Sequence, residues 1–155
     1  MQNMDQIAEI EPVYRTSIRP SARVSVDGPE AAYKLFLTTW DEKKIELQEE
    51  LKVMLLNADN KVLGICHLSS GGCSGTVSDP KLLFAAALKA NATFVILCHN
   101  HPSGKLTPSA ADFALTKTVK QIGEILGILV LDHLVITSES YFYFADEGVL
   151  NGVSE

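Results

Sequence analysis

The sequence contains little cysteine and no paired-cysteine pattern. Only three cysteines occur in the 155 residues, and no two of them form a Cys-x-x-Cys pair. An odd number of isolated thiols argues against a disulfide framework and fits a reducing compartment. The same absence gives little support to a zinc cluster built from cysteines.

Long apolar runs and a leader-like start are also lacking. The longest apolar runs, TFVILC and ILGILVL, fall well short of the roughly 20 residues that a membrane-spanning helix needs. Residues 1–20 carry Asp5, Glu9 and Glu11 and no apolar core segment, so no secretory signal is expected. These absences predict a cytoplasmic protein that makes no membrane contact.

The chain has no excess of positive charge. Its 13 basic and 19 acidic residues give a net charge of −6, which disfavours direct binding of nucleic acid. Residues 80–120 differ, because five lysines stand there against a single aspartate. The simpler interpretation is a chance spacing of lysines on solvated helix faces. The alternative is a mild attraction of an anionic substrate to this segment.

The order of the expected elements predicts one α/β domain. Pro29, Pro80 and Pro108 each stand where a helix is expected to begin. The expected helices cover residues 27–40, 78–92 and 107–127, and the expected strands lie within 51–69, 93–98, 128–137 and 140–145. This order predicts a mixed sheet with helices on both faces.

Both ends of the chain are expected to lie outside this domain. Residues 1–24 lack periodicity and are interpreted as a flexible N-terminal arm that can add an edge strand. The domain itself is assigned to residues 25–150, and residues 151–155 are assigned to a C-terminal tail.

The stretch CHNHPSGKLTPSAAD, from Cys98 to Asp112, carries the clearest chemical signal. Side chains alternate along a strand, so His99 and His101 are expected on one face, with Cys98 and Asn100 on the other. A lone His-x-His pair is more often part of an ordinary polar loop. Two imidazoles on one side of a buried strand's end nevertheless suit a zinc site.

Further residues at suitable spacing favour the metal site over the polar loop. Ser109 and Asp112 are three residues apart in the first turn of the next helix, so the Asp112 carboxylate could join the two histidines. Three protein ligands and a water form the catalytic zinc arrangement. Ser109 is positioned to donate a hydrogen bond to an oxyanion. For the general base, Glu46, Glu49 and Glu50 all remain candidates.

This pattern resembles a known motif. His-x-His, followed by Ser-x-x-Asp at His99, His101, Ser109 and Asp112, is similar to the JAMM motif of the JAB/MPN metalloprotease superfamily. The fuller text HNHPSG, with LDHLVIT and YFADEG downstream, resembles the RadC branch over roughly residues 25–150.

The resemblance implies a cytidine-deaminase-like fold, in which a curved mixed sheet lies between helices. It implies Zn²⁺ as the cofactor, with the ligands His99, His101 and Asp112. It assigns to Ser109 the serine that assists the oxyanion. The register of the strand aligns the upstream glutamate of the family with Glu49, with Glu50 as the second choice.

The leading hypothesis is therefore a zinc-dependent hydrolase that cleaves a peptide or isopeptide amide bond of a peptide or protein substrate, with Glu49 activating the water. The alternative is a non-catalytic accessory module of DNA repair or of a mobile element. RadC proteins of full architecture carry an N-terminal helix-hairpin-helix domain for which this chain has no room, so DNA binding is not expected. A nucleobase deaminase would need H-x-E and P-C-x-x-C, and neither is present.

The remaining polar residues of interest receive structural roles. His133 lies in an apolar segment and is expected to be a buried core histidine with Asp132 as its partner. Asn100 is expected to brace a loop, and Ser103 is expected either to support a turn or to hydrogen-bond a metal ligand.

Overall fold

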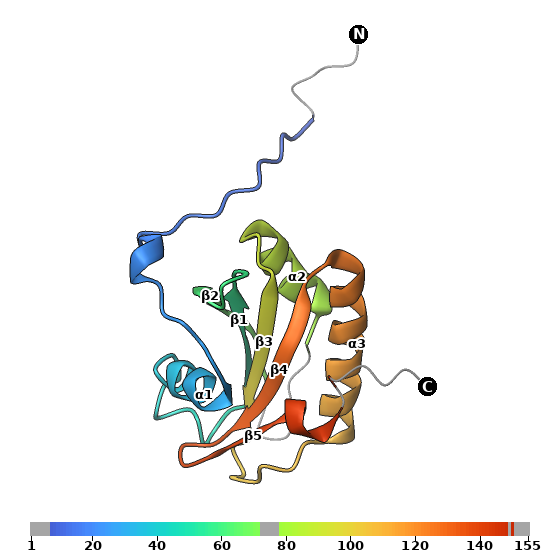
Figure 1. Cartoon of the computed structure of the whole chain (residues 1–155). Helices are drawn as coiled ribbons and strands as arrows, with labels where there is room; N and C mark the ends of the chain where they lie inside the picture. Colours follow the sequence, from blue (N-terminus) through green and yellow to red (C-terminus); the bar gives the residue numbers. More distant parts are fainter. Residues whose placement is uncertain (1–6, 72–77, 149, 151–155) are drawn as a thin grey trace.

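The computed structural model describes residues 7–71, 78–148 and 150, and its centre is a five-stranded sheet of order β2-β1-β3-β4-β5 (Figure 1). The strands are β1 (Glu50–Leu56), β2 (Val62–Ser70), β3 (Phe94–Asn100), β4 (Leu129–Ile136) and β5 (Tyr141–Tyr143). The helices are α1 (Pro29–Leu37), α2 (Pro80–Lys89) and α3 (Ala110–Leu126), with short 3-10 turns η2 (Pro20–Ala22) and η3 (Phe144–Glu147).

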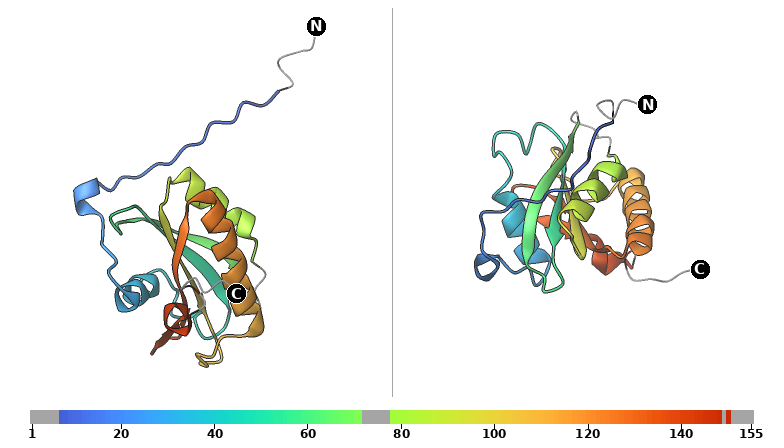
Figure 2. Two further views of the ribbon diagram at one scale, coloured as in Figure 1. Left: turned by 45° about the vertical axis from the view of Figure 1, so that its right-hand side comes forward. Right: turned by 90° about the horizontal axis from the view of Figure 1, so that it is seen from above.

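The sheet is mixed, as predicted. Strand β1 pairs antiparallel with both β2 and β3, β3 pairs parallel with β4, and β4 pairs antiparallel with β5. A parallel pair needs a crossover connection, and α3 supplies it between β3 and β4. Helix α1 covers one face of the sheet while α2 and α3 cover the other, which is plain when the molecule is seen from above (Figure 2).

Local capping determines where the helices begin and end. Asp79 caps α2 by accepting a hydrogen bond from the Lys81 backbone N–H at 2.9 Å, with Pro80 in the first position. The helix that was predicted to begin at Pro108, which would make Thr107 its cap, begins two residues later at Ala110 and is capped by Ser109. Ser109 is the preferred N-cap because it forms a reciprocal capping box with Asp112, which Thr107 does not. Within the described residues, no helix has the length and apolar character to span a bilayer.

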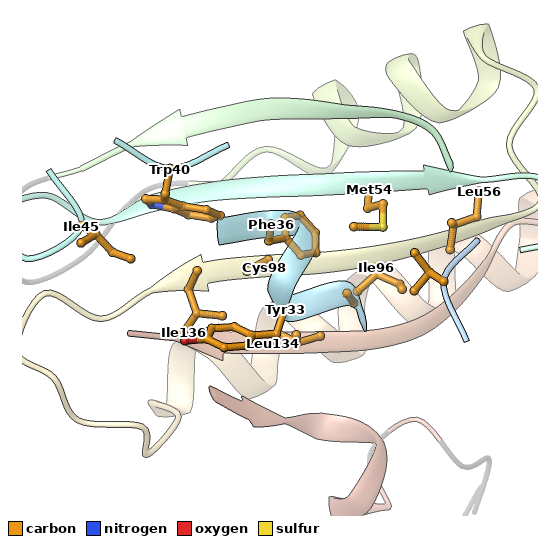
Figure 3. Packing of buried hydrophobic residues seen from close by; sticks show 12 residues of the cluster. Tyr33, Phe36, Trp40, Ile45, Met54, Leu56, Ile96, Cys98, Leu134 and Ile136 are labelled. Atoms are coloured by element: carbon orange, nitrogen blue, oxygen red, sulfur yellow. The ribbon is translucent and has the colours of Figure 1, made fainter. Parts of the chain in front are cut away.

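The two faces of the sheet carry separate cores. The core on the α1 face includes Phe36, Met54 and Cys98 (Figure 3). The core between the sheet and helices α2 and α3 includes Leu83 and Leu97. Cys98 thus faces α1, and the alternation of the strand turns its neighbour His99 to the α3 side, so the two lie on opposite faces as predicted.

The N-terminal arm and the residue that follows it contact the β2 edge of the sheet. Ser25 forms an isolated antiparallel bridge with Lys61, and the Tyr14 hydroxyl donates to the Leu63 carbonyl at 2.6 Å. Apart from this Tyr14 contact, the described part of the arm before the bridge extends away from the domain (Figure 1). Its flexibility stays a prediction, and the tail assigned to residues 151–155 lies outside the described residues.

Candidate metal centre

Four predicted residues meet at one end of the sheet. His99 lies near the end of β3 and His101 follows it, Asp112 comes from the first turn of α3, and Glu49 directly precedes β1. Leu51 is the partner of His99 in the β1–β3 ladder, so the start of β1 lies beside the end of β3. One ligand atom from each of the four residues lies within 4.8 Å of the others.

The ligand atoms of the two histidines and the aspartate form a tight triangle. His99 Nε2 lies 3.0 Å from His101 Nε2 and 3.3 Å from Asp112 Oδ1. His101 Nε2 lies 3.4 Å from Asp112 Oδ2. His99 is almost fully buried, while His101 and Asp112 are partly open to solvent. The cluster can therefore be reached from outside while it is anchored in the core.

A tight turn fixes the ring of His101. His101 Nδ1 lies 2.8 Å from the Lys105 carbonyl, which can only accept, so Nδ1 carries a proton and the lone pair of the neutral ring is on Nε2. Gly104 makes this return possible because its φ of 80° lies in the left-handed region that glycine adopts readily. The Ser103 hydroxyl accepts from the Lys105 N–H at 3.3 Å, which supports the first of its two predicted roles, that of a turn residue.

The capping box of α3 holds the Asp112 carboxylate. The Ser109 N–H donates to Asp112 Oδ2 at 2.7 Å, and the Asp112 N–H donates to Ser109 Oγ at 3.1 Å. Burial alone would raise the pKa of Asp112, but the neighbouring His101 and His99 side chains and the Ser109 N–H outweigh it and hold this pKa well below its usual value. The carboxylate is therefore ionised, and Ser109 lies directly beside it.

Glu49 completes the group. The residue is only 9% exposed, and burial raises the pKa of its carboxyl, an effect that His99 and His101 partly oppose. A small cavity of about 90 Å³ opens beside it, with walls that include Glu49, Leu51, Ser78, His99, Ala111, Asp112 and Leu115. A buried carboxylate with a raised pKa next to such a space is suited to exchange a proton with a small molecule.

The other two glutamates that the sequence offered point elsewhere. Glu50 lies on the opposite face of β1, where its carboxylate is 3.8 Å from Lys52 Nζ and 4.0 Å from His67 Nδ1. Glu46 is exposed and accepts a hydrogen bond from the Ser138 hydroxyl at 3.3 Å. Of the three candidate glutamates, only Glu49 lies beside His99 and His101.

Asn100 braces the segment that leads to Glu49, as predicted. This fully buried amide accepts a hydrogen bond from the Glu50 N–H at 2.7 Å. It donates to the carbonyls of Ile45 at 2.7 Å and Gln48 at 2.8 Å. Three bonds from one rigid strand end thus fix the backbone on both sides of Glu49.

The sequence interpretation correctly predicted that His133 is a buried core histidine, but it missed the contact of this ring with the cluster, and it missed Thr116. The imidazole of His133 contacts His99 Nδ1 and Thr116 Oγ1, each at 2.7 Å. It does not pair with Asp132, whose carboxylate accepts the backbone N–H groups of His133 and Ala145. Burial lowers the pKa of His133 well below its usual value, so the ring is neutral. The i, i+4 spacing of Asp112 and Thr116 on one helix face was the available signal.

The donor set fits a divalent metal ion. Two imidazole nitrogens and two carboxylates converge, so lone pairs face lone pairs unless a cation or protons lie between them. Imidazole nitrogen and carboxylate oxygen are ligands that Zn²⁺ accepts in a four-coordinate site. The four residues therefore form a candidate metal centre.

Comparison with known proteins agrees with this geometry. The model of the family described as RadC-like JAB domain matches residues 26–149, which include all four residues of the centre. The chain belongs to this family. The predicted resemblance to the RadC branch of the JAB/MPN superfamily is thereby confirmed, and so is the single mixed-sheet α/β fold.

Several curated relatives share this RadC-like domain. A UPF0758 protein of Flavobacterium johnsoniae is 52% identical over 101 residues, which are 65% of this chain and 44% of the relative. A UPF0758 protein of Symbiobacterium thermophilum is 37% identical over 138 residues, 89% of this chain and 58% of the relative. The chain spans about half the length of the curated relatives it matches. The name UPF0758 specifies no reaction.

Proposed function

We propose that this RadC-like JAB domain is a zinc-dependent hydrolase that cleaves the amide bond of a peptide or an isopeptide. The observation that carries the proposal is the convergence of Glu49 with His99, His101 and Asp112, within 4.8 Å, at one end of the sheet. A metal-ligand triad with a buried carboxylate beside it is what metal-assisted hydrolysis requires.

His99, His101 and Asp112 would hold the metal. Bound there, Zn²⁺ lowers the pKa of water to about 7 and polarises a carbonyl oxygen. The Lys105 carbonyl keeps the lone pair of His101 on Nε2, and the capping box keeps Asp112 ionised and in place. These contacts direct the lone pairs of the neutral His101 ring and of the Asp112 carboxylate toward the metal position.

Glu49 acts as the general base and then as the general acid. Its carboxylate takes one proton from the attacking water as the water oxygen bonds to the carbonyl carbon. It returns that proton to the amide nitrogen as the C–N bond breaks, which leaves a carboxylic acid and an amine. Burial raises the pKa of Glu49, and this raised pKa suits a group that must both accept and release a proton.

Ser109 stabilises the developing oxyanion. Its hydroxyl oxygen accepts from the Asp112 N–H, so the hydroxyl's own proton is the part that serves as a donor. Ser109 also stands at the N-terminus of α3, where the partial positive charge of the helix favours a negative oxygen.

Space for a substrate lies next to His101. A hollow of about 300 Å³ has walls from three loops, with the lining residues Ile45, Glu46, His101, Pro102, Ser103, Gly104, Thr137, Ser138 and Glu139. The hollow offers room for the part of a substrate that extends beyond the scissile amide bond. Peptides and isopeptides both have such a part, so the hollow favours them as substrates.

The test is the Glu49→Gln variant, assayed on a library of linear peptides and of peptides joined through lysine ε-amides, with cleavage followed by mass spectrometry. We expect turnover to fall by about 10²- to 10⁴-fold, because the proton transfers are lost. Zinc content should stay at the wild-type level, because the three ligands remain.

Glu42→Gln is the matched control, because the same change is made on an exposed glutamate of the same segment, and this residue lines neither the cavity beside Glu49 nor the hollow beside His101. It should keep wild-type turnover. Undiminished hydrolysis by Glu49→Gln would overturn the assignment of Glu49. No cleavage of any library member by the zinc-loaded wild type would favour the non-catalytic accessory module.

A further inference from the structure

A buried histidine lies directly behind the candidate metal centre. His133, on β4, is fully buried, and its Nε2 lies 2.7 Å from Nδ1 of His99. The ring of Phe144 stacks on the His133 ring with a centroid distance of 4.7 Å and an angle of 12° between the planes. His133 is therefore held in one orientation, with one nitrogen toward His99 and the other toward Thr116.

The hydroxyl of Thr116 decides which nitrogen of His133 carries the proton. Thr116 Oγ1 donates its single proton to the Asp112 carbonyl four residues earlier, at 2.7 Å. The same oxygen lies 2.7 Å from His133 Nδ1. Because its proton is already donated, the oxygen can only accept a hydrogen bond there. Nδ1 of His133 must therefore be the N–H.

The direction of the bond between the two histidines follows from this. A fully buried imidazole without a carboxylate at either nitrogen is neutral, so His133 Nε2 carries a lone pair. It accepts from His99, whose Nδ1 must be the N–H. The lone pair of His99 is thereby placed on Nε2, which is the nitrogen that faces His101 and Asp112.

We infer that Thr116 and His133 are positioning residues that set the tautomer and ring orientation of His99, so that its Nε2 is free to ligate the metal. The inference rests on the proposed metal site and adds two residues to it. The relay runs from the Asp112 carbonyl through Thr116 and His133 to His99, so it connects two of the ligands. The Lys105 carbonyl performs the same task for His101.

The reverse tautomer shows why the relay matters. If His133 carried its proton on Nε2, His99 Nδ1 would have to accept, and the His99 proton would move to Nε2. That proton would point at Asp112 Oδ1, 3.3 Å away, and would block the ligand nitrogen. Loss of the groups that orient a ligating histidine typically lowers metal affinity by about 10- to 100-fold.

The test combines Thr116→Val with the conservative Thr116→Ser, because valine keeps the shape of threonine without its hydroxyl. Long-range ¹H–¹⁵N correlation spectra of metal-free protein at mildly alkaline pH report the tautomer of each imidazole, and chelator competition reports the Kd for zinc. We expect the Nδ1–H tautomer for both His99 and His133 in wild type and in Thr116→Ser. Thr116→Val should show a mixture of tautomers and a Kd raised by about 10- to 100-fold.

Thr118→Val is the matched control, because Thr118 is an exposed residue of the same helix. It should keep both the tautomers and the Kd. Wild-type protein with the proton on Nε2 of either histidine would overturn the inference, even if Thr116→Val did not fold. Wild-type tautomers and affinity in a folded Thr116→Val would also overturn it. A failure of the proposed hydrolysis can be told apart from a failure of this inference, because the tautomers of the metal-free protein do not depend on turnover.

Discussion

Both faces of the sheet bury charged groups, but the surroundings of these groups differ. On the α1 face, Lys52 Nζ donates to the Thr39 carbonyl at 2.5 Å, lies 3.8 Å from the Glu50 carboxylate and lies 4.2 Å from the centre of the Trp40 ring. A buried cation there meets an anion, a carbonyl and the face of an aromatic ring. On the α3 face, two carboxylates and two imidazoles direct lone pairs at one another.

This difference separates a structural network from a candidate site. The charged groups around Lys52 satisfy one another, so burial of polar side chains does not by itself indicate function. The cluster at Glu49 has a surplus of acceptors around one point, and only a cation or added protons can balance it. The excess of acceptors, rather than the burial of the side chains, makes this cluster a candidate metal centre.

The largest effect on stability is expected at Lys52 on the α1 face, where the buried charges of Lys52 and Glu50 balance each other. Lys52→Met should destabilise the protein by about 3–5 kcal/mol, because it leaves the buried Glu50 carboxylate without its cation. In metal-free protein, Glu49→Gln should leave the melting temperature equal to wild type or higher, because burial already penalises the charged form of Glu49. Thermal unfolding of the two metal-free variants measures the contrast directly.

The control for Lys52→Met is Lys43→Met, since Lys43 is exposed and its loss should cost at most about 0.5 kcal/mol. If metal-free Glu49→Gln is destabilised as strongly as Lys52→Met, the proposed difference between the two faces of the sheet is wrong.

An intermediate effect is expected at Asp132, which lies on the α1 face of β4. Burial raises the pKa of Asp132 from 3.8 to about 6, partly opposed by the backbone N–H groups of Ala145 and His133. A carboxyl with a raised folded-state pKa favours folding most when it is protonated. Its contribution is therefore lost as the pH rises from about 4 through 6. The loss amounts to at most about 3 kcal/mol, at 1.36 kcal/mol per pKa unit.

Asp132→Asn removes this titration. The free energy of unfolding of the variant minus that of wild type should increase between pH 4 and pH 7, as followed by urea denaturation at each pH. Asp59→Asn, on the exposed β1–β2 turn, serves as the control. A difference that stays constant over this range would contradict the assigned cause.

The smallest effect on stability is expected at Ser109. Ser109→Ala should cost about 1 kcal/mol, because the hydroxyl caps α3 at the Asp112 N–H, whereas Ser109→Gly should cost only a few tenths. Both variants lack the proposed oxyanion donor, so both should lose turnover by about 10²- to 10³-fold. Thermal melts and rates separate the two roles. Wild-type turnover in a folded Ser109→Gly would exclude the oxyanion role.

Much of this architecture follows from short-range signals in the sequence. Strand alternation correctly separated Cys98 from His99, and the spacing of Ser109 and Asp112 placed both at the start of α3. Asp79 and Pro80 correctly indicated the start of α2. These features depend on neighbours within about four residues, which the sequence displays directly.

The remaining features depend on contacts between distant segments. His133 meets His99 across 34 positions of the chain, through the parallel pairing of β3 and β4, which no local pattern specifies. The choice between Glu49 and Glu50 needed the register of β1, because the two residues face opposite sides of the strand. The start of α3 was misplaced because Thr107 and Ser109 both suit a cap, and only Ser109 forms the reciprocal bonds with Asp112.

The central claim is that His99, His101 and Asp112 bind a metal ion. The direct test is the metal content per chain of wild type, His101→Ala and His67→Ala, purified without added zinc and measured by mass spectrometry of metals. His67 is the control because it is an exposed histidine on β2 that is not part of the cluster. About one zinc ion per chain is expected in wild type and in His67→Ala, and none in His101→Ala. A folded wild type without metal, or equal metal in His101→Ala, would contradict the claim.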